Sequence, residues 1–287
     1  MTTLTSKTVL LTGASRGLGV YIARALAKEQ ATIVCVSRSQ LGLAQTCNVI
    51  QAAGGKAIAI PFDVRNIAQL STLVQQAQDI VGPIDVLINN AGIEINGAFA
   101  NYSLAEIQSI FNTNLLAVME LTRLLLPSMM ERGSGRIVNI ASLAGKKGVA
   151  FNSVYSASKA GLMMWTDAMR QELVGTGVNI SVVCPGYVSQ TGMTVDTRVP
   201  APKLAGISTP KSVANAIVSA IKHKKAEVIV NQNLIMESLT KFMLAIGQLS
   251  PTSVDRIYRW LGVVNFNQKR AENRVKDSYV AIESHHA

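Results

Sequence analysis

Short apolar runs alternate with longer amphipathic stretches through the first two-thirds of the chain. The apolar runs read as buried strands and lie at 8–13, 31–38, 56–64, 84–92, 135–142 and 178–186. Helix-like segments between them include 17–29, 66–81, 104–131 and 153–175. Because strand–helix–strand units close by right-handed crossovers, this order predicts an α/β fold with a doubly wound parallel sheet. A further apolar run at 226–231 predicts a seventh strand.

The 287 residues are predicted to form a single domain, because no internal repeat and no low-complexity linker divides them. We expect a Rossmann-type domain over 1–231, with a substrate loop at 187–210. A C-terminal helical extension over 232–287 is expected to pack on the same domain. Within it, 238–249 is a strongly apolar helix candidate, 251–262 has an amphipathic helix pattern, and the polar end is expected to fray.

The amino-acid composition agrees with a single globular domain and adds information about its surface charge and possible ligands. Nearly half of the residues are apolar and 15% are charged, which indicates a well-buried core. The net charge of +10 fits attraction to phosphates or anionic membranes, or a solvated basic surface with a pocket for a phosphorylated cofactor. Nucleic-acid binding is not expected, because no Lys/Arg run is interleaved with aromatic residues. Neither cysteines nor histidines have metal-ligand spacing, no signal peptide is visible, and a cytoplasmic location is expected.

A glycine-rich turn joins the first strand to the first helix. Its sequence is TGASRGLG, at 12–19. Gly13, Gly17 and Gly19 allow the turn to tighten and its backbone amides to approach a pyrophosphate, while the helix N-terminus adds partial positive charge. Strand, glycine turn and helix in this order predict a dinucleotide-binding site.

The end of the second strand indicates which dinucleotide is bound. A protein that selects NAD normally presents an acid to the ribose 2'-hydroxyl, but here Ser37 and Arg38 stand in that place. Arg38, helped by Arg16, would pair with a 2'-phosphate. The sequence therefore favours NADP(H) over NAD.

Tyr155 and Lys159 stand four positions apart in a predicted helix and so share one face. An ammonium group beside a phenol favours the phenolate, which would lower the pKa of Tyr155 and make it a usable acid or base. The spacing alone is equally compatible with a half-buried tyrosine and a lysine that extends past it to solvent.

Five motifs now stand in one order: TGASRGLG at 12–19, NNAG at 89–92, Ser142, YSASK at 155–159 and PG at 185–186. Over 7–195 the series closely resembles the short-chain dehydrogenase/reductase family. The resemblance implies hydride transfer between NADP(H) and a carbonyl or alcohol. It makes Tyr155 the general acid and Ser142 the group that polarises the substrate oxygen. Lys159 would lower the pKa of Tyr155 and hold the nicotinamide ribose, and Asn114 would hold a water for proton relay.

The glycine turn and the resemblance together define an expected cofactor site. Asp63 is expected to contact the adenine, and Thr191 to replace a threonine that the family often has where this chain has Gln190. The expected cofactor residues are Gly13, Ser15, Arg16, Gly17, Leu18, Gly19, Ser37, Arg38, Asp63, Val64, Asn90, Ala91, Gly92, Tyr155, Lys159, Pro185, Gly186, Val188 and Thr191.

The substrate is less closely defined. Leu143, Val149, Phe151 and Met193 are expected to line an apolar pocket, which suits a lipophilic alcohol or ketone. A 3-oxoacyl thioester reductase is the main rival within the enzymes, and a non-catalytic NADP(H)-binding sensor or scaffold is the rival outside them.

The helices at 234–262 would cover the pocket, pack across a dimer, or contact a membrane. The membrane alternative places Arg256, Arg259, Lys269 and Arg270 against lipid phosphates. The resemblance also implies a homodimer or homotetramer.

Overall fold

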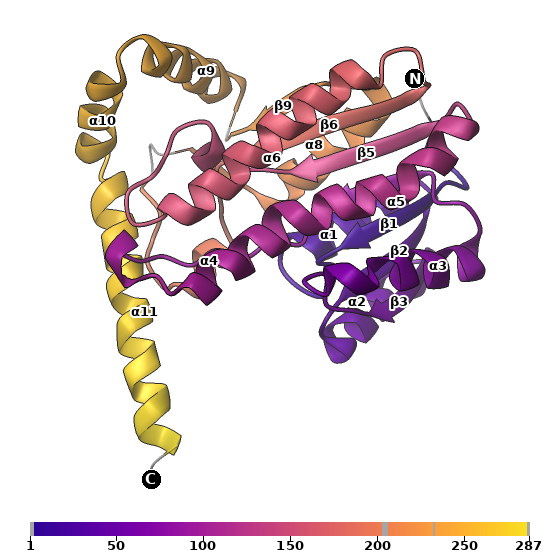
Figure 1. The fold of residues 1–287 in the computed structure, drawn as a ribbon, viewed down its shortest axis with the longest axis horizontal. Coiled ribbons are helices and arrows are strands. Elements are labelled where there is room, and N and C mark those ends of the chain that lie inside the picture. The colour runs from indigo at the N-terminus through magenta and orange to yellow at the C-terminus, as the bar shows by residue number, and fades with distance from the viewer. Residues whose placement is uncertain (1–2, 203–205, 232, 286–287) are drawn as a thin grey trace.

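The computed structural model describes residues 3–202, 206–231 and 233–285 and contains a seven-stranded sheet between two layers of helices (Figure 1). All neighbouring strands are parallel, in the order β3-β2-β1-β4-β5-β6-β9. The strands are β1 Thr8–Thr12, β2 Thr32–Ser37, β3 Lys56–Pro61, β4 Val86–Asn89, β5 Gly135–Ile140, β6 Val178–Pro185 and β9 Glu227–Val230. The predicted doubly wound sheet and its seventh strand are therefore confirmed.

Helices cover both faces of the sheet. Those within the first 231 residues are α1 Leu18–Lys28, α2 Gln40–Ala52, α3 Leu70–Val81, α4 Leu104–Phe111, α5 Ala117–Glu131, α6 Ser153–Glu172, α7 Met193–Asp196 and α8 Pro210–His223. Side chains alternate along a strand, so Val9 and Leu11 pack in one cluster with α1, α2 and α8. Leu10 points to the opposite face and packs in a second cluster with α3 and α5. This two-sided burial explains the continuous apolar strand runs.

The predicted helix over 104–131 is interrupted in the structure. A capping box of Ser103 and Glu106 begins α4, and a π-helical turn, Asn112–Leu116, separates α4 from α5. A π-turn adds a residue without ending the helix, so the apolar pattern continues through it and gives no sign of the break. Two short parallel strands, β7 Tyr187–Val188 and β8 Ile207–Ser208, also lie within the predicted substrate loop.

Three helices follow the sheet: α9 Leu234–Leu249, α10 Pro251–Trp260 and α11 Val263–His285. Figure 1 shows them beyond the end of the sheet toward which β5 points, with α11 passing beside α4. α11 is helical to His285, and its Phe266, Asn267 and Arg270 are buried, while the expected fraying of the polar end stays a prediction. Polar residues on this helix have partners inside the protein, which the composition of the segment does not reveal.

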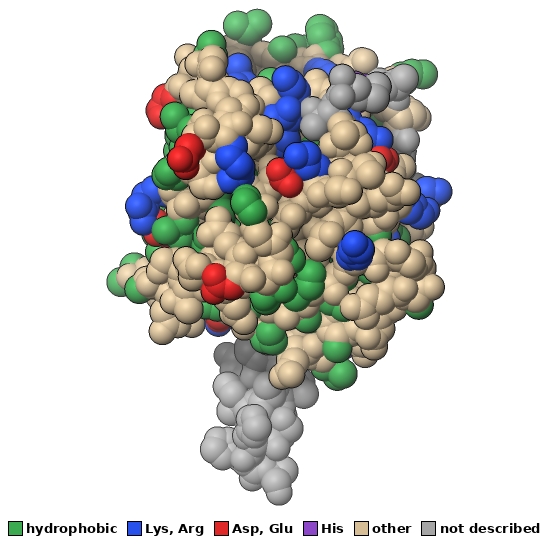
Figure 2. Space-filling view, turned by 90° about the vertical axis from the view of Figure 1, so that its right-hand side faces the viewer, with side chains coloured by type: hydrophobic (Ala, Val, Ile, Leu, Met, Phe, Trp, Pro, Cys, Tyr) green, Lys and Arg blue, Asp and Glu red, His purple; other side chains and the backbone are tan. Residues whose placement is uncertain are grey.

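The surface charges, the cysteines and the helix lengths test the expectations about surface charge, metal binding and membrane spans. On the face in Figure 2, Lys and Arg side chains are interspersed with Asp and Glu side chains, as in a solvated basic surface. Cys35, Cys47 and Cys184 are buried free thiols. Across the described ranges, no group of His, Cys, Asp and Glu is arranged to hold a metal ion. In the same part of the chain, no helix is both long and apolar enough to cross a membrane.

Candidate active site

One cavity of about 710 Å³ lies at the carboxyl ends of the central strands. Every residue expected to bind the cofactor lines it, from the glycine turn at Gly13 to Thr191 beyond β6. Ser142, Tyr155 and Lys159 line the same cavity, whereas Asn114 does not. Parallel strands place the loops after their carboxyl ends side by side, and so motifs far apart in sequence meet here.

The glycine turn fits a pyrophosphate. Gly13 and Gly17 have φ of 67° and 59°, a backbone region that favours glycine. A Cβ atom at Gly19 would lie 2.0 Å from the carbonyl oxygen of Gly13, so only glycine allows this close approach. The Ser37 hydroxyl is buried at the cavity wall and has no hydrogen-bond partner among the described residues. A bound ribose would satisfy it, so these residues fit a dinucleotide.

The two asparagines of NNAG join neighbouring strands. Asn89 Nδ2 donates to Asn139 Oδ1 at 2.9 Å, which links the ends of β4 and β5. Asn90 Nδ2 donates to the carbonyl oxygens of Thr12 and Gly13, at 3.0 and 3.1 Å. The motif thus holds the glycine turn against β4, while Ala91 and Gly92 face the cavity.

The charged side chains at the expected adenosine end of the cavity differ in whether they already have a partner. Arg38 is exposed and lines the cavity, as a partner for a 2'-phosphate would. Arg16 instead forms an ion pair of 2.8 Å with Asp196, so its expected help to Arg38 is not supported. The Asp63 carboxylate, expected at the adenine, accepts bonds from Arg65, and these lower the pKa of Asp63 below its ordinary value.

Ser142, Tyr155 and Lys159, which the sequence predicts to be catalytic, lie in the same part of the cavity. Ser142 acts on the Tyr155 phenol by lowering its pKa, and the Ser142 Oγ accepts from the Ala144 amide at 3.2 Å. Lys159 Nζ donates to the Ile140 carbonyl oxygen at 2.7 Å and lies 5.8 Å from the centre of the Tyr155 ring. Ser142 lies two positions after the end of β5, and the other two side chains belong to α6, so only the fold brings the three together.

The expected lowering of the Tyr155 pKa by Lys159 is not what the structure shows. Burial raises the pKa of Tyr155 above its ordinary value and the negative charge of Glu94 adds to this, while Ser142 and Arg270 oppose it. Burial also lowers the pKa of Lys159 to about 8. Desolvation disfavours the charged form of both groups, and here it outweighs their neighbours.

Asn114 lies in the π-turn, close to but outside the cavity. Its Oδ1 accepts from the Ile93 amide at 2.9 Å, and its Nδ2 donates to the Ile93 carbonyl and the Ser158 hydroxyl, both at 3.0 Å. The side chain is thus engaged in holding the cavity wall at Ile93. A proton relay that starts from this amide finds no support here, although the predicted role of the residue stays untested.

The substrate end of the cavity agrees with most of the sequence expectations. Leu143, Val149 and Met193 line it. Phe151 does not line it; this residue has a φ of 60°, and its carbonyl accepts from the Gly97 amide at 2.9 Å. Thr191 lines the cavity and Gln190 does not, as expected for the replaced threonine.

The C-terminal helices form the far wall. The residues that they contribute to it are Thr240, Met243, Leu244, Gly247, Gln248, Val254, Tyr258, Leu261 and Val263. An ion pair of 2.7 Å joins Lys147, which lines the cavity, to Asp255 on α10. Of the three alternatives for these helices, the structure supports covering the pocket. Arg270 cannot face lipid phosphates, because it is buried and paired with Glu94.

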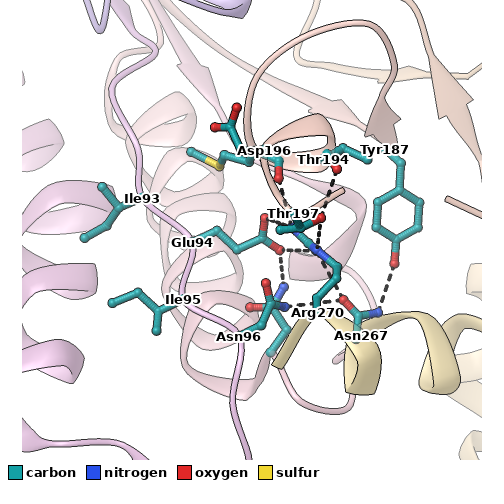
Figure 3. A network of polar contacts seen from close by, with 12 residues as sticks. Ile93, Glu94, Ile95, Asn96, Tyr187, Thr194, Asp196, Thr197, Asn267 and Arg270 are labelled. Carbon is teal, nitrogen blue, oxygen red and sulfur yellow. Dashed lines mark hydrogen bonds and ion pairs between the residues drawn. The ribbon is translucent and has the colours of Figure 1, made fainter. Parts of the chain in front are cut away.

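Glu94 is the site residue that the sequence analysis missed. It lines the cavity two positions after NNAG and pairs with Arg270 of α11 (Figure 3). An acidic residue soon after a buried strand is a sequence signal that could have marked Glu94 as a site residue. Its partner Arg270, however, lies 176 positions away, in a segment that was expected to fray.

Comparison with known proteins defines the family. The family model described as short chain dehydrogenase matches residues 7–201, with its motifs on the elements described above. The chain belongs to the short-chain dehydrogenase family. It is thus an oxidoreductase, as the order of its motifs predicted.

Individual proteins that are similar to this chain also carry the names of reductases. The chain is 90% identical over 285 residues to "Ketoacyl reductase HetN" of Nostoc sp. (strain PCC 7120), with 99% of both chains covered. It is 40% identical over 200 residues to a putative ketoacyl reductase of Streptomyces coelicolor, covering 69% of this chain and 76% of that protein.

Two solved structures resemble the fold closely. The actinorhodin polyketide ketoreductase with NADPH matches with a TM-score of 0.74 and 34% identity, covering 80% of this chain and 97% of that one. A metagenomic short-chain oxidoreductase in complex with NADP matches with a TM-score of 0.70 and 30% identity, covering 81% and 100%.

Proposed function

We propose that this protein reduces the ketone of 3-oxoacyl thioesters with NADPH. One observation carries the proposal: a single cavity joins the glycine turn, the Ser142–Tyr155–Lys159 centre and an apolar wall from α9 and α10. The names of the similar proteins agree, because two of them are ketoacyl reductases and the solved structures hold NADP or NADPH.

NADP(H) is the cofactor that the site suits. The glycine turn would hold the pyrophosphate, Arg38 the 2'-phosphate, and Lys159 the nicotinamide ribose. When bound, the nicotinamide supplies or accepts a hydride. No acid stands beside Arg38 at the end of β2, where a protein that selects NAD would carry one.

The catalytic centre suits the direction of reduction. A carbonyl that receives a hydride develops negative charge on its oxygen, and this oxygen needs hydrogen-bond donors and finally a proton. Ser142 Oγ would donate a hydrogen bond, and Tyr155 would donate the proton. Tyr155 carries its proton at neutral pH and would donate it, and burial, which raises its pKa, makes it a weaker acid than a free tyrosine.

The apolar wall indicates the substrate class. Met243, Leu244 and Val254 would pack against an acyl chain rather than a sugar, which needs polar partners. The rival outside the enzymes, a non-catalytic NADP(H) sensor, has no need of Ser142, Tyr155 and Lys159 together in the cavity that would hold the cofactor.

The experiment is a fluorescence titration with NADPH and NADH, followed by absorbance at 340 nm with 3-oxoacyl thioesters of increasing chain length. Simple lipophilic ketones and alcohols complete the panel, and Tyr155→Phe is the control. Tighter binding of NADPH and thioester turnover lost in the variant are expected. Binding without any turnover would favour the sensor, and turnover of simple ketones alone would favour a lipophilic alcohol dehydrogenase.

We further propose a homodimer or homotetramer in the cytoplasm. Both follow from the sequence alone, the first through the family resemblance. Size-exclusion chromatography with light scattering tests the assembly, and a monomer at micromolar concentration would contradict it.

A further inference from the structure

Arg270 is an arginine of the C-terminal helix α11 that reaches into the core. Its side chain is 1% exposed and forms a two-pronged ion pair with Glu94. Nη1 donates to Oε1 at 2.9 Å and Nη2 to Oε2 at 2.7 Å (Figure 3). A bidentate pair fixes orientation as well as distance, because both hydrogen bonds must form together.

The same guanidinium binds the substrate loop. Arg270 Nε donates to the Thr197 hydroxyl and Nη2 to the Met193 carbonyl, both at 3.2 Å. Within α11 itself, Nη1 donates to Asn267 Oδ1 at 3.3 Å, and the Phe266 ring lies 5.2 Å from the guanidinium carbon. One side chain therefore ties together the segment after β4, the loop around α7 and α11, as Figure 3 shows.

Two of these partners belong to the cavity wall. Glu94 and Met193 line the cavity, whereas Arg270 does not, so Arg270 acts on the site only through them. Glu94 also accepts from Asn152 Nδ2. Asn152 directly precedes α6, the helix that carries Tyr155, so the network extends to the start of the catalytic helix.

We propose that Arg270 is a positioning residue, which shapes the ketone-binding end of the site from the C-terminal helix by holding Glu94 and the loop at 193–197 in place. The proposal rests on the ketone reduction proposed above. Without Arg270, the Glu94 carboxylate would be left buried without its cation beside Tyr155. Arg38 and the glycines of the turn form no hydrogen bond with Arg270 or Glu94, and the turn meets the loop at 193–197 through the ion pair of Arg16 with Asp196. Cofactor binding should therefore depend on Arg270 much less than ketone binding does.

The test compares Arg270→Met with Arg270→Lys in the full-length protein. Lys269→Met is the matched control, an exposed lysine one position earlier on the same helix. We expect Arg270→Met to raise KM for the ketone by about tenfold to a hundredfold, as small displacements of a substrate site do. The NADPH dissociation constant should change much less, because the loop at 193–197 meets the glycine turn through the Arg16–Asp196 ion pair. Arg270→Lys should be intermediate, since an ammonium cannot form the two-pronged pair, and Lys269→Met should behave as wild type.

Hydrogen–deuterium exchange supplies a readout that does not depend on turnover. In Arg270→Met, amides in 93–97 and 192–198 should exchange faster, while those of β1 and β4 should not. Unchanged KM and unchanged exchange in these segments, or equal loss of ketone and NADPH binding, would overturn the proposal. If Arg270→Met does not fold, Arg270→Lys is judged by the same criteria. A wild type that reduces no ketone would refute the proposed function, and the exchange result would still decide whether Arg270 holds the two segments.

Discussion

Lys159 lends itself to a stability test because its ammonium is almost wholly buried. Its side chain is 4% exposed, and burial lowers its pKa from 10.5 to about 8. A buried lysine that must stay charged at neutral pH opposes folding. Lys159→Met removes the charge but keeps a long, flexible apolar side chain of similar reach.

The magnitude follows from the two pKa values. A fall from 10.5 to about 8 corresponds to roughly 3 kcal/mol of destabilisation, at about 1.4 kcal/mol per pKa unit. Below pH 8 both the folded and the unfolded protein carry the proton, so this penalty is complete. Between pH 8 and 10.5 only the unfolded state keeps the proton, so the penalty falls as pH rises and is absent above pH 10.5.

Lys159→Met also removes the hydrogen bond to the Ile140 carbonyl. Leaving that oxygen unpaired costs about 1–3 kcal/mol, and this cost does not change with pH. The net stability of the variant at one pH is therefore a poor test. Its stability relative to wild type should, however, be greater at pH 7 than at pH 10 by roughly 2–3 kcal/mol.

Urea unfolding at both pH values, followed by tryptophan fluorescence, measures this difference. Lys269→Met provides the baseline for losing one exposed lysine from the chain. A stability difference between Lys159→Met and wild type that is the same at pH 7 and pH 10 would refute the reasoning. The same variant should be inactive in the thioester assay if Lys159 holds the cofactor ribose.

Other substitutions test the rest of the site. Gly19→Ala places a Cβ 2.0 Å from the Gly13 carbonyl oxygen and should weaken NADPH binding by more than about tenfold in a fluorescence titration. Arg38→Glu should weaken NADPH binding by about tenfold to a hundredfold with little effect on NADH, since a charged hydrogen bond is lost; equal weakening of both would contradict the proposed 2'-phosphate contact. Val254→Asp, on the buried side of α10, should raise KM for long-chain thioesters more than for short ones, with cofactor affinity unchanged.

The sequence by itself determined the sheet, its strand positions and the cofactor end of the site. These depend on local signals: apolar runs that must be buried on both faces, and glycines in a turn between the first strand and the first helix. The motif order then identified the family, and the residues expected at the cofactor all line one cavity. Their individual contacts with NADP(H) stay predictions.

Only the tertiary structure decided the substrate end and the electrostatics. The pKa of Tyr155 depends on how deeply the residue is buried and on the charge of Glu94. Neither quantity can be predicted from the spacing of residues along the chain. The turn at Phe151 and the pairing of Arg16 with Asp196 likewise depend on loops whose paths long-range contacts set. Arg270 shows the reason most directly. From its neighbours in sequence alone, a charged arginine would be expected at the surface. Arg270 is instead buried, because the carboxylate of Glu94, 176 positions away on another element, pairs with it.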